Sequence, residues 1–121
     1  MTTGSAGVTG GARDAHRKPA TAARMYDYYL GGIHNFPADQ EAARTVLERA
    51  PQLRTIVRDN RAFLARAVRY LISAGLRQFL DLGSGIPTEG NVHEIAQAAA
   101  PDARVVYVDT DPDAVSESRE L

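Results

Sequence analysis

The sequence predicts an α/β fold in which helices come first and a small parallel sheet follows, in the order strand, helix, strand, helix. Three observations support this prediction. Apolar residues recur at helical spacing between residues 39 and 74, two short apolar runs follow at 79–82 and 105–108, and turn residues separate these segments. With 121 residues, the chain is one domain or part of one.

The N-terminal part changes character twice. Residues 1–20 are rich in Gly, Ser, Thr and Ala without apolar periodicity, so we expect a disordered tail. The following stretch crowds aromatic and apolar side chains around the Gly31-Gly32 break and is expected to pack on another part of the chain. From Asp39, which we predict as the N-cap, an amphipathic helix should run until Pro51 stops it.

A longer amphipathic helix is predicted from Leu53, with Gly75 as the residue that follows its C-cap. Its arginines, Arg61 among them, fall mostly outside the apolar stripe. Residues 21–75 therefore read as one helical segment.

The pattern then becomes that of a sheet. Residues 79–82 form a nearly continuous apolar run, as expected of a parallel strand covered on both faces. A helix is predicted at 91–100, with Asn91 and Glu94 as a capping box. The second strand, 105–108, ends before Asp109. Asp111 is the predicted N-cap of a last helix, which we expect to continue to the end of the chain.

Composition and charge exclude several classes of site. Cysteine is absent, which removes disulfides, thiolate zinc sites and thiol nucleophiles, and neither His34 nor His93 has a second ligand at a metal-binding spacing. No apolar run could span a membrane and no signal peptide is present, so we expect a cytoplasmic protein without a membrane partner.

The distribution of charge divides the chain into two parts. Residues 1–78 carry eleven Arg and one Lys against six acidic residues, and residues 79–121 carry two Arg against nine acidic residues. We expect the two parts to attract each other. Nucleic acid is not an expected partner, because the arginines have no interleaved aromatic residues.

The segment D-L-G-S-G, from Asp81 to Gly85 at the end of the first strand, is the predicted ligand-binding turn. Thr88 stands where a dinucleotide signature needs its third glycine, and no P-loop is present. A carboxylate before Gly83 repels a pyrophosphate and attracts a cationic amine, while the glycines let the ligand approach the backbone closely. Asp109, at the end of the next strand, can accept two ribose hydroxyls. An amine and a ribose without a phosphate describe S-adenosylmethionine.

At these residues the sequence resembles the class I S-adenosylmethionine-dependent methyltransferases, through "LDLGSG" and "VVYVDTDP". With "ARMYDYYLGGIHNFPADQEAA", "RDNRAFLARAVRYL" and "NVHEIAQ", it is similar to an actinobacterial group called the S-adenosyl methyltransferase family, over residues 20–121. Pro87 replaces the common third glycine of class I, but "GIPT" is normal in this group. The resemblance implies a Rossmann-like fold, S-adenosylmethionine as cofactor and a small-molecule methyl acceptor whose identity the sequence does not reveal.

The resemblance also assigns cofactor-binding positions. The loop around the methionine moiety matches Asp81, Gly83 and Gly85, the ribose acid matches Asp109, and Asp111 lies where neighbouring groups approach the adenosine. The N-terminal block, which lies over the cofactor cleft in the family, adds Arg24, Tyr26, Asp27 and Asn35. Tyrosines in such a cluster are more often packing residues than ligands. No catalytic residue is identified.

The resemblance covers only the N-terminal half of the family fold, with its parallel sheet truncated. Residues 76–121 are expected to be the first β-α-β-α of the cofactor-binding domain, and residues 21–75 a helical segment that caps the cleft. We therefore expect a methyltransferase fragment that is inactive alone. The alternative is a non-catalytic interaction module, or half of a split enzyme that needs a complementing chain. An open sheet edge would also invite self-association.

Overall fold

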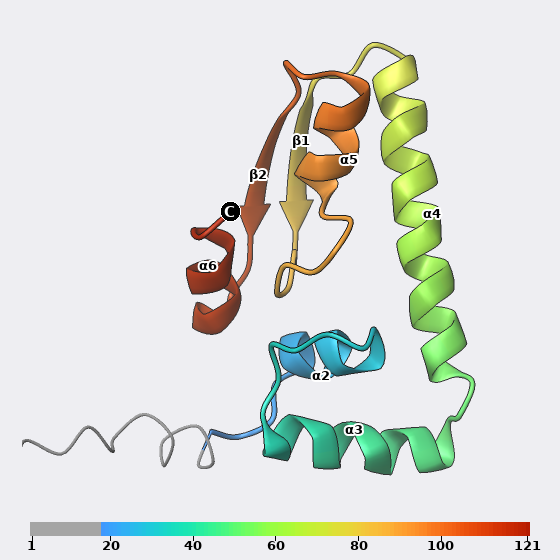
Figure 1. Cartoon of the computed structure of the whole chain (residues 1–121), viewed down its shortest axis with the longest axis vertical. Coiled ribbons are helices and arrows are strands. Elements are labelled where there is room, and N and C mark those ends of the chain that lie inside the picture. The colour runs from blue at the N-terminus through green and yellow to red at the C-terminus, as the bar shows by residue number, and fades with distance from the viewer. Residues whose placement is uncertain (1–17) are drawn as a thin grey trace, which may run out of the picture.

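The computed structural model describes residues 18–121, and it has the predicted order of elements. The elements are α2 (Ala22–Tyr29), α3 (Pro37–Arg49), α4 (Leu53–Ser73), β1 (Gln78–Leu82), α5 (Val92–Ala99), β2 (Arg104–Val108) and α6 (Pro112–Ser118) (Figure 1). Strands β1 and β2 pair in parallel, in register from Gln78 opposite Arg104 to Leu82 opposite Val108. The predicted α/β fold with a small open parallel sheet is confirmed. The tail predicted to be disordered lies almost wholly outside the described residues.

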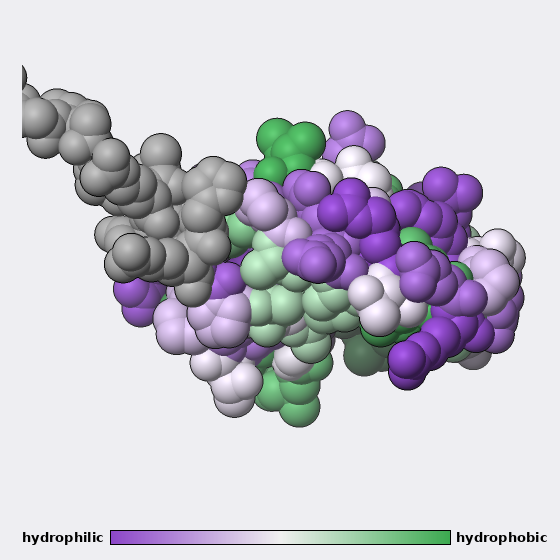
Figure 2. Space-filling model, turned by 90° about the horizontal axis from the view of Figure 1, so that it is seen from below, coloured by the Kyte–Doolittle hydropathy of each residue, from purple (hydrophilic) through white to green (hydrophobic). Residues whose placement is uncertain are grey.

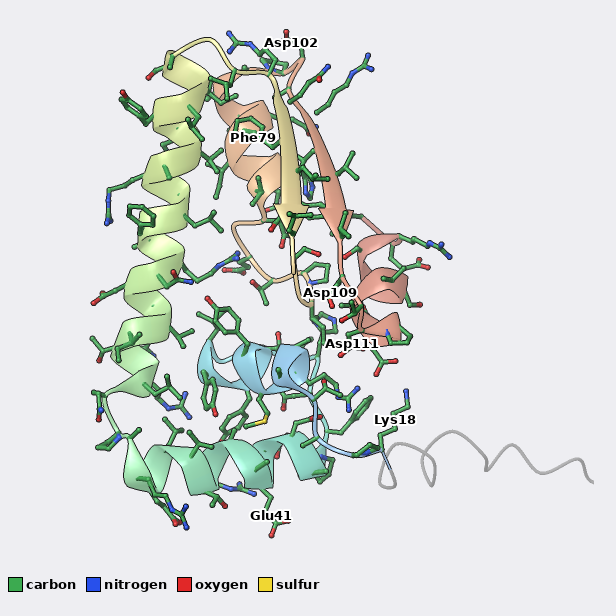
Figure 3. The ribbon with its side chains drawn as sticks, turned by 180° about the vertical axis from the view of Figure 1, so that it is seen from behind. Lys18, Glu41, Phe79, Asp102, Asp109 and Asp111 are labelled. Atoms are coloured by element: carbon green, nitrogen blue, oxygen red, sulfur yellow. The ribbon has the colours of Figure 1, made fainter. Side chains whose placement is uncertain are left out.

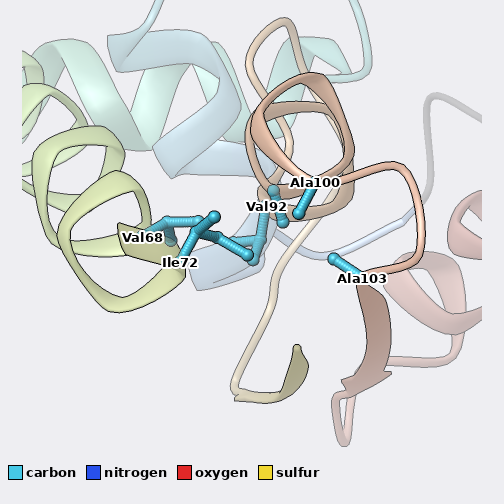
Figure 4. Packing of buried hydrophobic residues seen from close by; sticks show 6 residues of the cluster. Val68, Ile72, Val92, Ala100 and Ala103 are labelled. Atoms are coloured by element: carbon cyan, nitrogen blue, oxygen red, sulfur yellow. The ribbon is translucent and has the colours of Figure 1, made fainter. Parts of the chain in front are cut away.

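The main core lies where α4 and α5 pack together against the sheet (Figures 1 and 4). Helix α4 contributes Val68 and Ile72, which meet the first residue of α5, Val92. The remaining buried members are alanines, whose small side chains allow close packing. They are Ala96, Ala100 and Ala103. This packing fixes α4 beside α5, so that the other end of the long helix reaches past the carboxyl ends of the strands (Figure 1).

A second apolar cluster holds α2 between α3 and α4. Its buried centre is Tyr29 from α2, Ala43 from α3 and Val57 from α4. The aromatic-rich stretch around the Gly31-Gly32 break therefore packs as expected, and Gly31 (φ 80°) ends α2 in a left-handed conformation that glycine adopts without strain.

The opposite face of the sheet is bare in the described part of the chain. Side chains alternate along both strands, and four of the six outward ones are apolar: Leu80 is 62% exposed, Leu82 70%, Val106 58% and Val108 43%. The other two, Gln78 and Arg104, lie at the starts of the strands. The prediction that β1 is covered on both faces is therefore wrong for this chain. The near-continuous apolar run does form a strand, but the described helices cover one side of it only.

Two predicted helix boundaries need correction. Helix α3 begins at Pro37, with Phe36 as its N-cap, so Asp39 is the third helical residue instead of the cap. Its Oδ2 accepts the Phe36 backbone N–H at 2.8 Å and so still satisfies the start of the helix. Helix α6 ends at Ser118 and does not continue to the end of the chain. The C′ position of Gly75 (φ 98°) after α4 is as predicted.

The capping box predicted for α5 is also incorrect. Asn91 is the N-cap, as expected, but its Oδ1 accepts the N–H of Thr88 at 2.9 Å and its Nδ2 donates to Glu94 at 2.9 Å. The side chain of Asn91 therefore organises the preceding turn and binds its predicted partner directly.

The basic first part and the acidic second part are in contact. Lys18 and Arg24 both pair with Asp113 at the start of α6, and His34 lies 3.8 Å from Glu117 farther along that helix. Viewed from the α3 end, most of the described surface is hydrophilic (Figure 2). Among residues 18–121, no helix combines the length and apolar character needed to cross a membrane.

Candidate cofactor site

A cavity of about 680 Å³ opens at the carboxyl ends of the two strands. Its walls come from α2, from the middle of α4, from the turn after β1 and from the residues that follow β2. Asp109 and Asp111 lie in the space between the strand ends and α2 (Figure 3). Six of the predicted site residues line this one cavity: Tyr26, Asp81, Gly83, Gly85, Asp109 and Asp111.

The turn after β1 folds over the end of β2. The backbone N–H groups of Gly83 and Ser84 donate to the carbonyl of Val108 at 2.7 and 3.2 Å. Both Gly83 (φ 68°) and Gly85 (φ 70°) are in the left-handed region, and nothing lies within 4 Å of the position that a Cβ would occupy on either. The glycines are therefore required by the backbone conformation, and they leave open space for a ligand beside it.

Asp109 joins the two strand ends. Its Oδ2 accepts the Gly85 N–H at 2.7 Å, and its Oδ1 accepts the Asp111 N–H at 2.8 Å. Each carboxylate oxygen has two lone-pair sites, so both retain capacity for a further donor such as a ribose hydroxyl. Asp111 in turn caps α6 by accepting the Asp113 N–H at 2.9 Å.

Asp81 is the acid at the end of β1 that faces the covered side of the sheet. Burial raises the pKa of its carboxyl, Arg61 lowers it, and the nearby charge of Asp109 raises it. A cationic ligand would stabilise the ionised form of this carboxylate, since the ligand would replace the water that burial removes.

Tyr107 lies on β2, directly opposite Asp81 in the strand register. Its hydroxyl accepts the backbone N–H of His93 at 2.8 Å and lies 2.6 Å from the His93 Nδ1, so it also holds the first turn of α5. Burial raises the pKa of the Tyr107 hydroxyl, the His93 hydrogen bond lowers it and the charge of Asp81 raises it.

We expect Tyr107→Phe to lower the free energy of unfolding by about 1 kcal/mol, because a hydrogen bond is lost while the ring still packs. Urea unfolding followed by circular dichroism measures this change. Exposed Tyr70→Phe is the matched control and should leave the midpoint unchanged. Equal midpoints for the two variants would contradict a supporting role for the Tyr107 hydroxyl.

The N-terminal candidates divide into two groups. Tyr26 reaches the cavity, and its hydroxyl accepts Nδ2 of Asn60 from α4 at 3.2 Å. Arg24 is buried and turned toward other protein groups. Its Nε donates to Asp39 at 2.8 Å, and its terminal nitrogens contact Asp113 and the carbonyl of Pro19. Arg24 thus ties α2 to α3 and α6 beside the cavity.

Asp27 and Asn35 organise the loop that follows α2. The Oδ2 of Asp27 accepts the His34 N–H at 2.9 Å and the Asn35 Nδ2 at 2.8 Å, and Asn35 also donates to the Gly32 carbonyl at 3.0 Å. A Cβ on Gly32 would lie 2.0 Å from the Oδ1 of Asp27, so this glycine is needed for close approach. Asp27 lines a separate cavity of about 720 Å³, bounded by the loop after α2 and by residues 87–89.

Sequence reasoning missed Arg61, which lines both cavities. Its Nη2 donates to the Gly90 carbonyl at 2.9 Å and so contacts the turn that leads into α5. The spacing held a signal that could have found it: positions 57, 61, 64 and 68 form one helical stripe whose other members are core residues. An arginine within a core stripe needs a partner or a ligand.

Comparisons with known proteins agree with the fold and with the motifs. The family model described as "S-adenosyl methyltransferase" matches residues 10–121. No curated protein matches. Among solved structures, a DUF574 family protein from Streptomyces avermitilis is 50% identical with a TM-score of 0.81, covering 85% of this chain and 40% of its own. A "putative methyltransferase" from Thermobifida fusca is 46% identical with a TM-score of 0.85, covering 92% and 42%.

This chain therefore spans about 40% of the length of each of the two solved relatives. Its fold corresponds to the N-terminal part of a methyltransferase fold, and the cofactor of the matched family is S-adenosylmethionine. The family match extends over the whole described structure, including the cavity at the strand ends. The chain belongs to the S-adenosyl methyltransferase family.

Proposed function

We propose that this chain supplies the S-adenosylmethionine-binding part of an enzyme that methylates a small molecule. One observation carries the proposal: a single cavity gathers Asp81, the glycine turn and Asp109 at the carboxyl ends of adjacent parallel strands. Ligands bind at this edge of open α/β sheets. The three carboxylates that line the cavity suit a cationic ligand and oppose a phosphate.

The chain's own residues bind and orient the ligand. Asp81 is proposed to take the ammonium of the methionine moiety, the glycine turn to let that moiety lie against the backbone, and Asp109 to accept the ribose hydroxyls. Asp111 and Tyr26 form the neighbouring walls. Arg24, Asp27 and Asn35 are proposed to position α2 and its loop over this space through the protein contacts that they already make.

S-adenosylmethionine supplies a methyl group activated by the sulfonium. The contribution of the protein is to hold that methyl in line with an acceptor nucleophile, since proximity and orientation supply much of the acceleration of such a transfer. The methyl acceptor and its activating groups are not assigned to any residue of this chain.

Asp81→Asn tests the proposal. We expect about a 10- to 100-fold loss of affinity for S-adenosylmethionine, because one hydrogen bond between charged groups is lost. Because the pKa of Asp81 is raised, the affinity of wild type should begin to fall at a higher pH than it would if Asp81 had the pKa of an ordinary carboxylate. The variant should lack this part of the pH dependence. Isothermal titration across acidic to neutral pH measures both effects.

Stability distinguishes a binding role from a structural one. The folded chain raises the pKa of Asp81, so the ionised carboxylate opposes folding at neutral pH, and this cost disappears as the pH falls through the raised pKa. Asp81→Asn should therefore leave the free energy of unfolding unchanged or slightly increased. Marked destabilisation together with unchanged affinity would show that Asp81 serves the fold.

A second function rests on the bare sheet face. Four apolar side chains exposed together on β1 and β2 favour a chain that is one part of a two-part assembly. Under this alternative, the chain binds a complementing polypeptide, and methyl transfer requires both parts. Co-purification from the native host, followed by mass spectrometry of the partner, separates it from a chain that acts alone.

A further inference from the structure

Arg61 is the one basic side chain among the described residues that line the cofactor cavity, which Asp81, Asp109 and Asp111 also line. S-adenosylmethionine carries a carboxylate beside its ammonium, and three acidic residues cannot bind that group. We propose that Arg61 binds the carboxylate of the methionine moiety. The inference rests on the proposed function. It assigns to the Arg61 guanidinium the recognition of the carboxylate at the amino-acid end of the ligand.

The tip of the Arg61 side chain is held by hydrogen bonds. Arg61 is half-buried on α4, on the helical stripe that also carries Val57 and Leu64. At its tip, Nη2 donates to the Gly90 carbonyl at 2.9 Å and lies 3.4 Å from that of Glu89. Within residues 18–121, Nε and Nη1 have no hydrogen-bond partner. These two donors remain for a ligand carboxylate.

Charge placement supports the same assignment. Arg61 lowers the pKa of Asp81, so the guanidinium and the carboxylate interact across the cavity wall. An amino acid carries its ammonium and its carboxylate on one carbon, and its binding site therefore needs opposite charges close together. Arg61 and Asp81 meet that requirement, with the glycine turn between β1 and α5 providing a backbone that the ligand can approach.

Decarboxylated S-adenosylmethionine is the probe, because it keeps the ammonium, sulfonium and ribose and lacks only the carboxylate. Amide NMR titrations of the whole chain, at millimolar concentrations of each ligand, measure even weak binding. Wild type should bind S-adenosylmethionine more tightly than the probe. In Arg61→Gln, affinity for S-adenosylmethionine should fall by about 10- to 100-fold. Affinity for the probe should change little, so the preference disappears.

Two further variants separate binding from structure. Asp81→Asn should weaken both ligands alike, because both carry the ammonium, and exposed Arg66→Gln on the same helix should affect neither. Equal weakening of both ligands in Arg61→Gln would mean that Arg61 only supports the turn at 88–90, and would overturn the inference while the cofactor site stands. Equal affinity of wild type for the two ligands would overturn it as well. Failure of wild type to bind either ligand would instead overturn the proposed function, and the Arg61 assignment with it.

Discussion

Asp39→Ala should lower the free energy of unfolding by about 3–5 kcal/mol, because it removes one partner of a buried ion pair. Asp39 is fully buried, and Arg24 beside it is 3% exposed. The carboxylate also accepts the backbone N–H groups of Thr21 and Phe36, at 3.0 and 2.8 Å. Folded domains have a total stability of about 5–15 kcal/mol, so this one change should remove a large share of it.

Thermal unfolding followed by circular dichroism measures the effect, and the same helix provides the control. Glu41 points away from the molecule (Figure 3), and Glu41→Ala should change stability by no more than about 0.5 kcal/mol. Arg24→Met combined with Asp39→Ala should cost less than the sum of the single changes, since neither charge is then left buried alone. A midpoint for Asp39→Ala equal to that of Glu41→Ala would contradict the role assigned to the pair.

Asp39 illustrates what the sequence could not reveal. Its position before an apolar-periodic run matched the preference for an N-cap, which is a local rule. Its partners, Arg24 and Thr21, precede it by 15 and 18 residues and are brought to it by the packing of α2 on α3. No period or motif encodes that contact. The same limit applies to Asn91, whose side chain accepts a hydrogen bond from the preceding turn instead of forming the predicted capping box.

The strand ends were predictable for the opposite reason. Each strand lies within a few residues of its aspartate, and β1 is also followed directly by the glycine turn. The parallel pairing of β1 with β2 then brings Asp81, the glycine turn and Asp109 to one edge. Arg61 lay beyond this reasoning because an arginine on an amphipathic helix is usually solvated. Its helical spacing from Val57 and Val68, both buried in the structure, is the sequence signal that sets it apart from the exposed arginines.

The isolated chain should bind S-adenosylmethionine about 100-fold more weakly than a complete member of the family, a difference of about 2.7 kcal/mol, and should transfer no methyl group. The groups proposed to bind the methionine moiety and the ribose line the described cavity, whereas no residue is assigned to the adenine or to the acceptor. Isothermal titration of this chain and of the complete Thermobifida fusca protein under the same conditions measures the difference. Affinity equal to that of the complete protein would contradict the argument.

Supplying the part of a relative that this chain does not cover should reverse the loss. The segment of the Thermobifida fusca protein that this chain does not cover, expressed separately, should restore affinity if it packs on the bare face of β1 and β2. Leu82→Lys tests that contact. The Leu82 side chain is 70% exposed, so position 82 should accept a lysine in the isolated chain, but not when the added segment covers the position. The variant should unfold at the same urea concentration as wild type and yet fail to be complemented. If the added segment complements Leu82→Lys as well as it complements wild type, the apolar face is not where the two parts meet. Covering that face would bury the lysine ammonium against leucine and valine side chains, and the described residues of the two strands offer it no compensating partner there.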